Sequence, residues 1–172
     1  MSRTLLLLRH AKSAWDTDAP SDFERPLAKR GKKDAPRIGR FLRMEGLVPD
    51  LVFSSSARRA RKTASKVARE LELSKKEIVL EDRLYEASLG TLLEFLATVP
   101  ADAETVLLVG HIPDLENLLR HLARELPKSP EGKLLPTCAV ARLVMPDDWR
   151  VLGRGVAELV SITRPKDLPE DA

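Results

Sequence analysis

Two apolar runs of this chain end at a histidine. Leu5 to Leu8 are followed directly by Arg9 and His10, and the run Thr105 to Val109 leads within two residues to His111. A neutral imidazole supplies a nucleophilic or basic nitrogen, and a guanidinium supplies a planar fork of N–H donors that suits a phosphate or a carboxylate. These residue types therefore point to chemistry on a bound anion.

A third apolar run, Asp50 to Phe53, passes through three serines into a helical pattern whose first turn is rich in cations. These cations are Arg58, Arg59, Arg61 and Lys62. Cations at a helix N-terminus oppose the helix dipole, so they do not stabilise the fold there. A bound anion would accept hydrogen bonds from the free N–H groups and from an arginine. We expect most of the four to be solvated surface charges and at least one to bind the anion.

The elements around these runs indicate how the polar residues meet. Each run is short, apolar and followed by a helical pattern, as is typical of buried strands in a parallel sheet. Right-handed crossovers bring the carboxyl ends of such strands to one edge of the sheet. None of the three segments supplies an obvious carboxylate for the cations, so a doubly charged phosphoryl group is the partner that fits.

The remaining pattern completes an α/β fold, which we predict to be a three-layer sandwich with a mostly parallel central sheet and helices on both faces. Apolar spacing predicts helices over residues 27–44, from the serines to Leu71, from a Ser88 cap to before Pro100, and from His111 to Leu126. Pro36 should kink the first helix or mark its effective start, and Gly46 should end it. Further strands are predicted at residues 77–80, 139–144 and 156–162.

Length and composition fit one domain, which we place at residues 1–163, followed by a polar tail at 164–172. The 172 residues carry a net charge of only +3 and 4% aromatic residues, which argues against a nucleic-acid-binding protein. No apolar run is long enough to cross a membrane, and the single cysteine, Cys138, excludes an internal disulfide. A cytoplasmic location is therefore expected, with Cys138 as a small buried residue.

A metal site is the alternative use of the two histidines. Its ligands would be His10, His111 and Asp114, but the neighbouring arginines would repel a divalent cation, and the sequence shows no paired acid cluster. We therefore expect no metal and no cofactor. The third histidine, His121, lies within the helix after His111 and is expected to pack on the flank of that helix.

In this order, the motifs resemble those of the histidine phosphatase superfamily, which has the phosphoglycerate-mutase-like fold. The Arg-His-Gly motif of that family, often extended by Glu-Ser-x-Trp-Asn, corresponds to Arg9 to Asp16. The pattern Ser-x-x-x-Arg-Ala-x-x-Thr-Ala matches Ser55 to Ala64 and singles out Arg59 as the phosphate ligand. The Gly-His and Leu-x-Glu elements match residues 110–111 and 84–86, and the resemblance runs from residue 4 to about 162.

Within the superfamily, the small size and three segments resemble the SixA-type phosphohistidine phosphatases. The segments are Arg25 to Leu27, Leu84 to Ala87 and Gly110 with His111. Two residues depart from the usual motifs: Ala11 replaces a glycine, and Asp16 replaces an asparagine that would help to hold phosphate in the mutases. An ionised Asp16 would repel phosphate, which counts against a sugar-phosphate mutase.

The resemblance implies a two-step phosphoryl transfer with a phosphohistidine intermediate on His10. It also implies that the substrate is bound by Arg9, Arg59, His111, Ser13 and Asp16. A carboxylic acid would protonate the leaving group and then activate water. Glu86 is the first candidate for that acid, and Asp16, Asp18 and Asp22 are the alternatives.

The implied substrate is phosphohistidine on a protein, because the chain has no insertion that could form a lid and an open pocket suits a side chain on a protein surface. Two other functions stay open. One is a phosphatase of small phosphomonoesters, and the other is a phosphoprotein-binding module without catalysis. The expected partners are thus a phosphorylated protein or a small phosphoester and phosphate, without nucleic acid or membrane.

Overall fold

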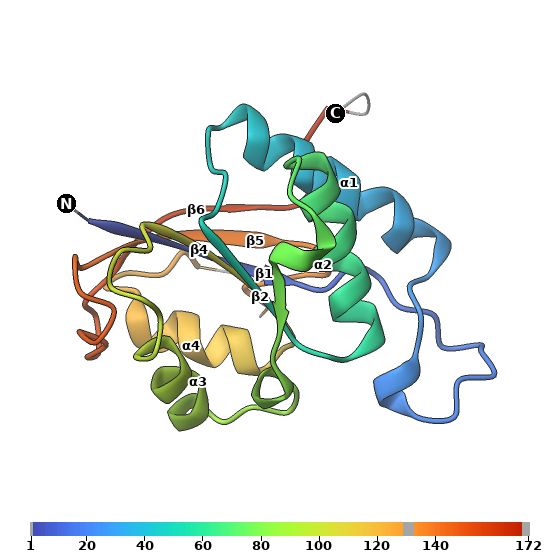
Figure 1. The fold of residues 1–172 in the computed structure, drawn as a ribbon, viewed down its shortest axis with the longest axis horizontal. Coiled ribbons are helices and arrows are strands. Elements are labelled where there is room, and N and C mark those ends of the chain that lie inside the picture. The colour runs from blue at the N-terminus through green and yellow to red at the C-terminus, as the bar shows by residue number, and fades with distance from the viewer. Residues whose placement is uncertain (1, 129–132, 170–172) are drawn as a thin grey trace.

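The structure is a computed structural model that describes residues 2–128 and 133–169. Within these residues, six strands form one sheet between two pairs of helices (Figure 1). The strand order is β3-β2-β4-β1-β5-β6. The strands are β1 (Arg3–Arg9), β2 (Leu51–Ser54), β3 (Ile78–Leu80), β4 (Thr105–Gly110), β5 (Val140–Met145) and β6 (Glu158–Thr163). The first four run parallel, and β5 is antiparallel to both β1 and β6.

Helices cover both faces of this sheet. They are α1 (Lys29–Met44), α2 (Arg58–Glu70), α3 (Leu89–Leu96) and α4 (Asp114–Leu122). Short 3-10 turns, η1 to η4, lie at Asp22–Glu24, Lys75–Glu77, Asp82–Leu84 and Pro165–Asp167. The helices α1 and α2 pack on one face and α3 and α4 on the other, which confirms the predicted three-layer α/β sandwich.

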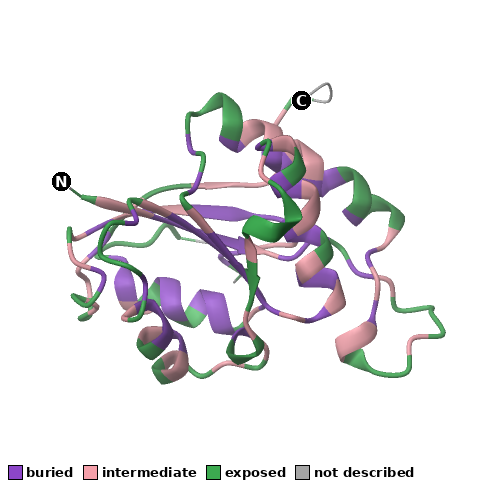
Figure 2. Cartoon of the chain, in the orientation of Figure 1, coloured by how far each residue is buried: buried purple, intermediate pink, exposed green. Residues whose placement is uncertain are grey.

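The four leucines of β1 explain why the sheet needs helices on both sides. Leu5 and Leu7 belong to the core under α3 and α4, whereas Leu6 and Leu8 belong to the core under α1 and α2. All four are completely buried, and Figure 2 shows that the central strands are buried along most of their length. Successive side chains of a strand point to opposite faces, so an unbroken apolar run is buried only when both faces are covered.

The carboxyl ends of β1, β2 and β4 lie together at one edge of the sheet, as predicted. Arg9 pairs with Gly110, and Ser54 pairs with Val109. The ladder continues by one bond beyond the strands, because the backbone N–H of His10 donates to the Gly110 carbonyl at 3.0 Å. The polar residues that follow these three strands therefore start from adjacent backbone positions.

Two helix boundaries differ from the sequence prediction. The first helix starts at Lys29 and runs through Pro36, so this proline does not mark its start. The fourth helix ends at Leu122, and Leu126, which was predicted to face inward, is 38% exposed. After Leu122 the chain no longer follows the helix, because Ala123 forms an isolated parallel β-bridge to Ala157.

Several smaller predictions are confirmed. Gly46 ends α1 with a φ of 70°, and the Ser88 side chain caps α3 by accepting from the Thr91 N–H. Cys138 is completely buried, and His121 lies on the flank of α4 with its Nε2 2.8 Å from the Leu152 carbonyl.

The last residues of the structure pack against the first helix. The Arg37 side chain donates to the carbonyls of Leu168 and Pro169. Residues 170–172 of the predicted tail and 129–132 of the loop before β5 lie outside the described residues. Of the helices in residues 2–128 and 133–169, none combines the length and apolar character needed to span a bilayer.

Gly31 provides a test of how tightly α1 packs on the backbone that follows His10. A Cβ at this position would overlap the carbonyl oxygen of Lys12 and lie 3.0 Å from the Lys12 nitrogen. We expect Gly31→Ala to lower the free energy of unfolding by about 1–3 kcal/mol, because the backbone must move. Urea denaturation measures this change.

Gly90 in α3 is the matched control, because the nearest atom to an added Cβ there is the Ser88 Oγ at 3.9 Å. Gly90→Ala should stabilise the protein by up to about 1 kcal/mol, since alanine favours the helix. Equal free energies of unfolding for the two variants would contradict the close packing of α1 on Lys12.

Candidate active site

His10 follows the last residue of β1 and is only 7% exposed. Its Nδ1 lies 2.8 Å from the carbonyl oxygen of Ala11. A carbonyl oxygen only accepts hydrogen bonds, so Nδ1 must carry the ring proton. In the neutral ring, Nε2 is then the nitrogen with a free lone pair, which a nucleophile needs.

The surroundings of His10 keep its ring neutral. Burial lowers the pKa of His10 to about 3, against the raising effect of the hydrogen bond to Ala11. This pKa is lowered further by electrostatic interactions with His111, Arg59 and Arg9. At neutral pH the lone pair on Nε2 is therefore available without a base to remove a proton.

Thr63 ties the backbone after His10 to the first turns of α2. Its Oγ1 accepts from the N–H of Ala11 at 3.0 Å and donates to the carbonyl of Arg59 at 2.7 Å. Both bonds are buried, which makes them costly to break. The position of His10 relative to Arg59 is thus set by one side chain.

His111 follows β4 and lies beside His10, with 5.2 Å between the ring centroids. Its Nε2 is 2.8 Å from the Ser55 Oγ, and this oxygen also accepts from the N–H of Ala57. The Ser55 hydroxyl can then donate its proton to Nε2, which leaves the ring proton on Nδ1. Nδ1 is buried and has no partner among the described residues, so it is free to donate to a ligand oxygen.

The ring of His111 is also neutral at pH 7. Burial lowers the pKa of His111 to about 4, and the charge of Arg59 lowers it further. The two adjacent imidazoles therefore have different roles: one offers a lone pair, and the other offers an N–H.

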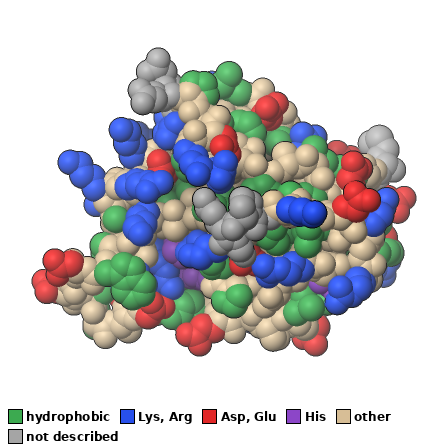
Figure 3. Space-filling model, turned by 180° about the vertical axis from the view of Figure 1, so that it is seen from behind, with side chains coloured by type: hydrophobic (Ala, Val, Ile, Leu, Met, Phe, Trp, Pro, Cys, Tyr) green, Lys and Arg blue, Asp and Glu red, His purple; other side chains and the backbone are tan. Residues whose placement is uncertain are grey.

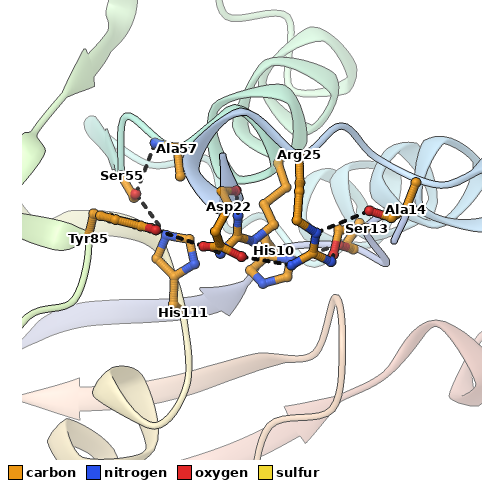
Figure 4. A network of polar contacts seen from close by, with 11 residues as sticks. His10, Ser13, Ala14, Asp22, Arg25, Ser55, Ala57, Tyr85 and His111 are labelled. Carbon is orange, nitrogen blue, oxygen red and sulfur yellow. Dashed lines mark hydrogen bonds and ion pairs between the residues drawn. The ribbon is translucent and has the colours of Figure 1, made fainter. Parts of the chain in front are cut away.

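Arg59 lies at the start of α2 and binds the 3-10 turn η1 through both terminal nitrogens of its guanidinium. Its Nη1 donates to the Asp22 carbonyl at 2.7 Å, and its Nη2 donates to the Asp22 carboxylate at 2.9 Å. Figure 4 shows Asp22 between His111 and His10, with Tyr85 and Arg25 directed toward it from opposite sides. Any anion that binds Arg59 must therefore share or displace Asp22.

The Asp22 carboxylate collects two further donors. The Tyr85 hydroxyl donates at 2.7 Å, and Arg25 Nη1 donates at 2.9 Å. The hydrogen bond from Tyr85, with those from Arg25 and Arg59, holds the pKa of Asp22 well below its usual range. Asp22 is thus ionised at neutral pH.

Arg9 is oriented by a second carboxylate on the other side of the site. Its Nη1 donates to the Leu135 carbonyl at 3.1 Å, and the N–H groups of Leu134 and Leu135 both donate to the buried carboxylate of Glu116. Burial lowers the pKa of Arg9, and the charge of Glu116 partly offsets this. The carboxylates that act on these cations come from elsewhere in the chain: Asp22 pairs with Arg59 directly, and Glu116 acts on Arg9 through Leu135.

A cavity of about 390 Å³ opens between these elements. It is lined by Asp22, Arg59, Tyr85, Glu86, His111, Ile112, Pro113 and Asp114. Figure 3 shows the molecule from behind relative to Figure 1, and on that face a histidine side chain is visible between Lys and Arg side chains. The cavity thus joins neutral imidazole, guanidinium and carboxylate groups, which is the donor set for transfer of an anionic group.

The acid candidates separate into two groups. Glu86 and Asp22 line the cavity, and Glu86 has a left-handed backbone with a φ of 54°. Asp16 and Asp18 are exposed and are not among the described residues that line it. Ser13 is buried, but its Oγ accepts from Arg25 Nη2.

The metal alternative has no support in the described part of the chain. No group of three or more His, Cys, Asp or Glu side chains there could hold a metal ion. Asp114, the third ligand of that alternative, instead accepts from the N–H of Ala87 at 2.9 Å.

Sequence reasoning missed the site roles of three residues, Arg25, Tyr85 and Glu116. Arg25 and Tyr85 were quoted only as parts of motifs, although Tyr85 directly precedes the acid candidate Glu86. Glu116 gave no signal, because its role depends on a loop that folds back to α4.

The two neutral histidines make stability depend on pH. The unfolded chain takes up protons near pH 6.5, whereas folded His10 and His111 do so only near pH 3 and 4, so the free energy of unfolding falls as pH drops below 6.5. At pH 5 each histidine should cost about 2 kcal/mol relative to pH 7. Urea unfolding at both pH values measures the loss.

His111→Gln isolates this effect, because glutamine does not titrate. The variant should lose about 2 kcal/mol less than the unchanged protein between pH 7 and pH 5. Asp22 does not interfere in this range, since its lowered pKa affects stability only in stronger acid. Parallel losses in the two proteins would show that His111 is not held neutral by the fold.

Known proteins resemble this chain in sequence and in structure. The model of the histidine phosphatase superfamily (branch 1) matches residues 5–99. An uncharacterised protein of Mycobacterium tuberculosis is 33% identical over 164 residues, which span 92% of this chain and 100% of that protein.

Two solved structures were provisionally assigned as phosphohistidine phosphatase SixA. The structure from Nakamurella multipartitia has 31% identity, a TM-score of 0.82 and coverage of 96% of this chain and 97% of that chain. The structure from Agrobacterium tumefaciens has 28% identity, a TM-score of 0.76 and coverage of 96% and 99%. With the family match extending over more than half of its length, this chain belongs to the histidine phosphatase superfamily and is a phosphatase whose structure is similar to those of the SixA type.

Proposed function

We propose that this phosphatase removes the phosphoryl group from phosphohistidine on a protein, through a covalent intermediate on His10. The observation that carries the proposal is the state of His10: its Nδ1 is held by the Ala11 carbonyl, and its ring is neutral. A free Nε2 lone pair among cations is suited to attack an anionic phosphorus.

In the first step, Nε2 of His10 forms a bond to phosphorus while the bond from phosphorus to the substrate nitrogen breaks. The equatorial oxygens accept hydrogen bonds from Arg9, Arg59 and Nδ1 of His111, which are the donors gathered at this edge of the sheet. The substrate imidazole leaves as a neutral ring when its other nitrogen already carries a proton. Imidazole titrates near neutral pH, so this proton is available at pH 7.

In the second step, water attacks the phosphorus and the bond to Nε2 of His10 breaks. The water gives its proton to a carboxylate, and inorganic phosphate leaves. Glu86 is the better candidate for the acid and base, because Asp22 is tied to Arg59, Tyr85 and Arg25 and its pKa is lowered. A phosphohistidine substrate needs little help from an acid in the first step, which suits a site in which Asp22 is ionised.

The relatives give separate support for this substrate class. Both solved structures above 25% identity that are described here were provisionally assigned as phosphohistidine phosphatases. Hydrolysis of small phosphomonoesters would use the same nucleophile and the same cations. Only the relative rates with the two substrate classes distinguish these functions.

His10→Ala should abolish turnover of a phosphohistidine-bearing carrier protein and of an aryl phosphate, because no other described group occupies the place of the nucleophile. We expect a loss of at least about 10⁴-fold in kcat, since a variant without a nucleophile retains only binding and electrostatic effects. Phosphate release measures turnover, and an acid-labile phosphoryl adduct on the protein should disappear in the variant.

His121→Gln is the matched control, because this histidine lies on the flank of α4 and contacts Leu152. It should retain both turnover and the adduct. Faster release from the carrier protein than from the ester supports the proposed substrate. Release from the ester alone assigns the site to small phosphoesters, and full activity of His10→Ala would refute the mechanism.

Asp22→Asn should strengthen the binding of inorganic phosphate. The carboxylate of Asp22 occupies the fork of Arg59, and its removal frees that cation and takes away a negative charge. We expect the inhibition constant of phosphate to fall by about 3- to 10-fold, which corresponds to roughly 1 kcal/mol, the repulsion between two unit charges about 4 Å apart in water. Inhibition of free phosphohistidine hydrolysis gives this constant.

Asp18→Asn is the control for the change of net charge, since Asp18 is exposed and lies outside the described lining of the cavity. It should leave the inhibition constant unchanged. Weaker phosphate inhibition in Asp22→Asn would mean that Asp22 orients Arg59 for the ligand instead of competing with it.

A further inference from the structure

The exposed side of α2 is almost entirely cationic. The helix buries Arg59 with four apolar residues and Thr63. The positions of α2 that are not buried carry Arg58, Arg61, Lys62, Lys66 and Arg69, with Ser65 between them and Glu70 at the end of the helix. We call these five cations the basic face of α2. They recur at helical spacing, so they form one continuous surface along the helix.

This charge is not neutralised within the described part of the chain. None of the five cations of the basic face forms an ion pair there, and the one acid of α2, Glu70, pairs with Arg40 of α1. The whole chain has 29 basic and 26 acidic residues, of which α2 has six basic and one acidic. The basic face is therefore a local excess and not a reflection of the overall charge.

Burial and nearby like charges both disfavour the charged form of Lys62. Partial burial lowers the pKa of Lys62, and the charges of Arg61, Lys75, Arg58 and Lys66 lower it further. Cations near the start of the helix also oppose its dipole. This arrangement of charges does not stabilise the fold, which favours a role in binding a partner outside the chain.

Three hollows meet at Lys62 and connect the basic face to its surroundings. One includes Pro26, Leu27 and Arg58, next to the loop that carries Asp22. A second follows Lys66 and Arg69 along the helix, and a third reaches Ile78 and Leu80.

The third hollow adds apolar surface to the cationic rim. Ile78 and Leu80 belong to β3, the strand at one edge of the sheet (Figure 1). Leu80 is 52% exposed and its neighbour Val79 is 44% exposed. A surface that combines apolar groups with a cationic border resembles a protein interface in its composition.

Arg58, Lys62 and Lys66 of the basic face lie within the area that a partner bound beside Arg59 would cover. Arg58 is adjacent to Arg59, which lines the cavity together with His111. Lys62 and Lys66 lie about 6 and 12 Å further along the axis of α2, at 1.5 Å per residue. A standard interface of about 800 Å² per partner extends roughly 16 Å from its centre.

We propose that the basic face of α2 docks an acidic surface of the protein that carries the phosphohistidine. The inference rests on the proposed function and adds the recognition of the carrier to it. Carboxylates of the carrier would pair with Lys62, Lys66 and Arg69, while its phosphorylated side chain enters the cavity beside Arg59. The described basic face contains no aromatic side chain on which nucleobases could stack, so a protein fits better than a nucleic acid.

The test uses one chemical reaction in two molecular contexts. The protein substrate is an acidic histidine carrier protein that has been phosphorylated with phosphoramidate, and the small substrate is free phosphohistidine. In the variant Lys62→Glu/Lys66→Glu, kcat/KM for the carrier should fall by at least about 10-fold, mainly through KM, because rim charges steer association. With free phosphohistidine, kcat/KM should stay unchanged.

Arg124→Glu/Arg154→Glu is the matched control, with the same change of charge at two exposed positions: Arg154 precedes Gly155 in the segment before β6, and Arg124 follows α4 and donates to the Gly155 carbonyl. It should retain full activity toward the carrier. Added NaCl should lower kcat/KM for the carrier in the unchanged protein and have little effect in the Lys62→Glu/Lys66→Glu variant.

The outcomes separate this inference from the proposed function. If the unchanged protein does not release phosphate from the carrier, the proposed function fails, and the docking face fails with it. If the charge-reversed variant acts on the carrier as well as the unchanged protein does, only the docking face is refuted. Binding of a single-stranded oligonucleotide that the variant loses, with carrier turnover intact, would assign the surface to nucleic acid.

Discussion

The parallel pairing of β1 with β4 is the constraint on which the rest of this structure depends. The register that places Arg9 beside Gly110 brings the next residues of both strands together, so the rings of His10 and His111 lie 5.2 Å apart. Because the sheet is covered on both faces, these rings are buried and stay neutral among cations. One arrangement of strands thereby creates both the nucleophile and a neighbouring hydrogen-bond donor.

The two arginines of the site are held by different means, and this difference bears on how a ligand enters. Glu116 acts on Arg9 through the backbone of Leu134 and Leu135, so its carboxylate never competes for the guanidinium. Asp22 instead contacts Arg59 directly, and the side chain of Asp22 is 49% exposed. Asp22 therefore occupies the position at Arg59 where an anion would bind, and a phosphoryl group with greater charge can displace its carboxylate.

Most of the fold and the core of the site could be predicted from the sequence. Four leucines before Arg9 require a strand that is buried on both faces, and the rule for parallel strands then brings three strand ends together. The contacts of Asp22 with distant residues could not be predicted from the sequence. Asp22 accepts from Arg59, which is 37 residues away, and from Tyr85, which is 63 residues away. Local pattern also failed at Leu126, where a bridge from Ala123 to Ala157 ends the helix early.

The sequence by itself determined which groups can do chemistry and where each enters the fold, because residue type and strand position are local properties. Only the tertiary structure decided the chemical state of those groups. The tautomer of His10 depends on the Ala11 carbonyl, its neutrality on burial, and the orientation of Arg59 on a carboxylate from a distant loop. Hydrogen-bond partners and solvent exposure are set by contacts between remote segments, and the order of residues along the chain does not specify these contacts.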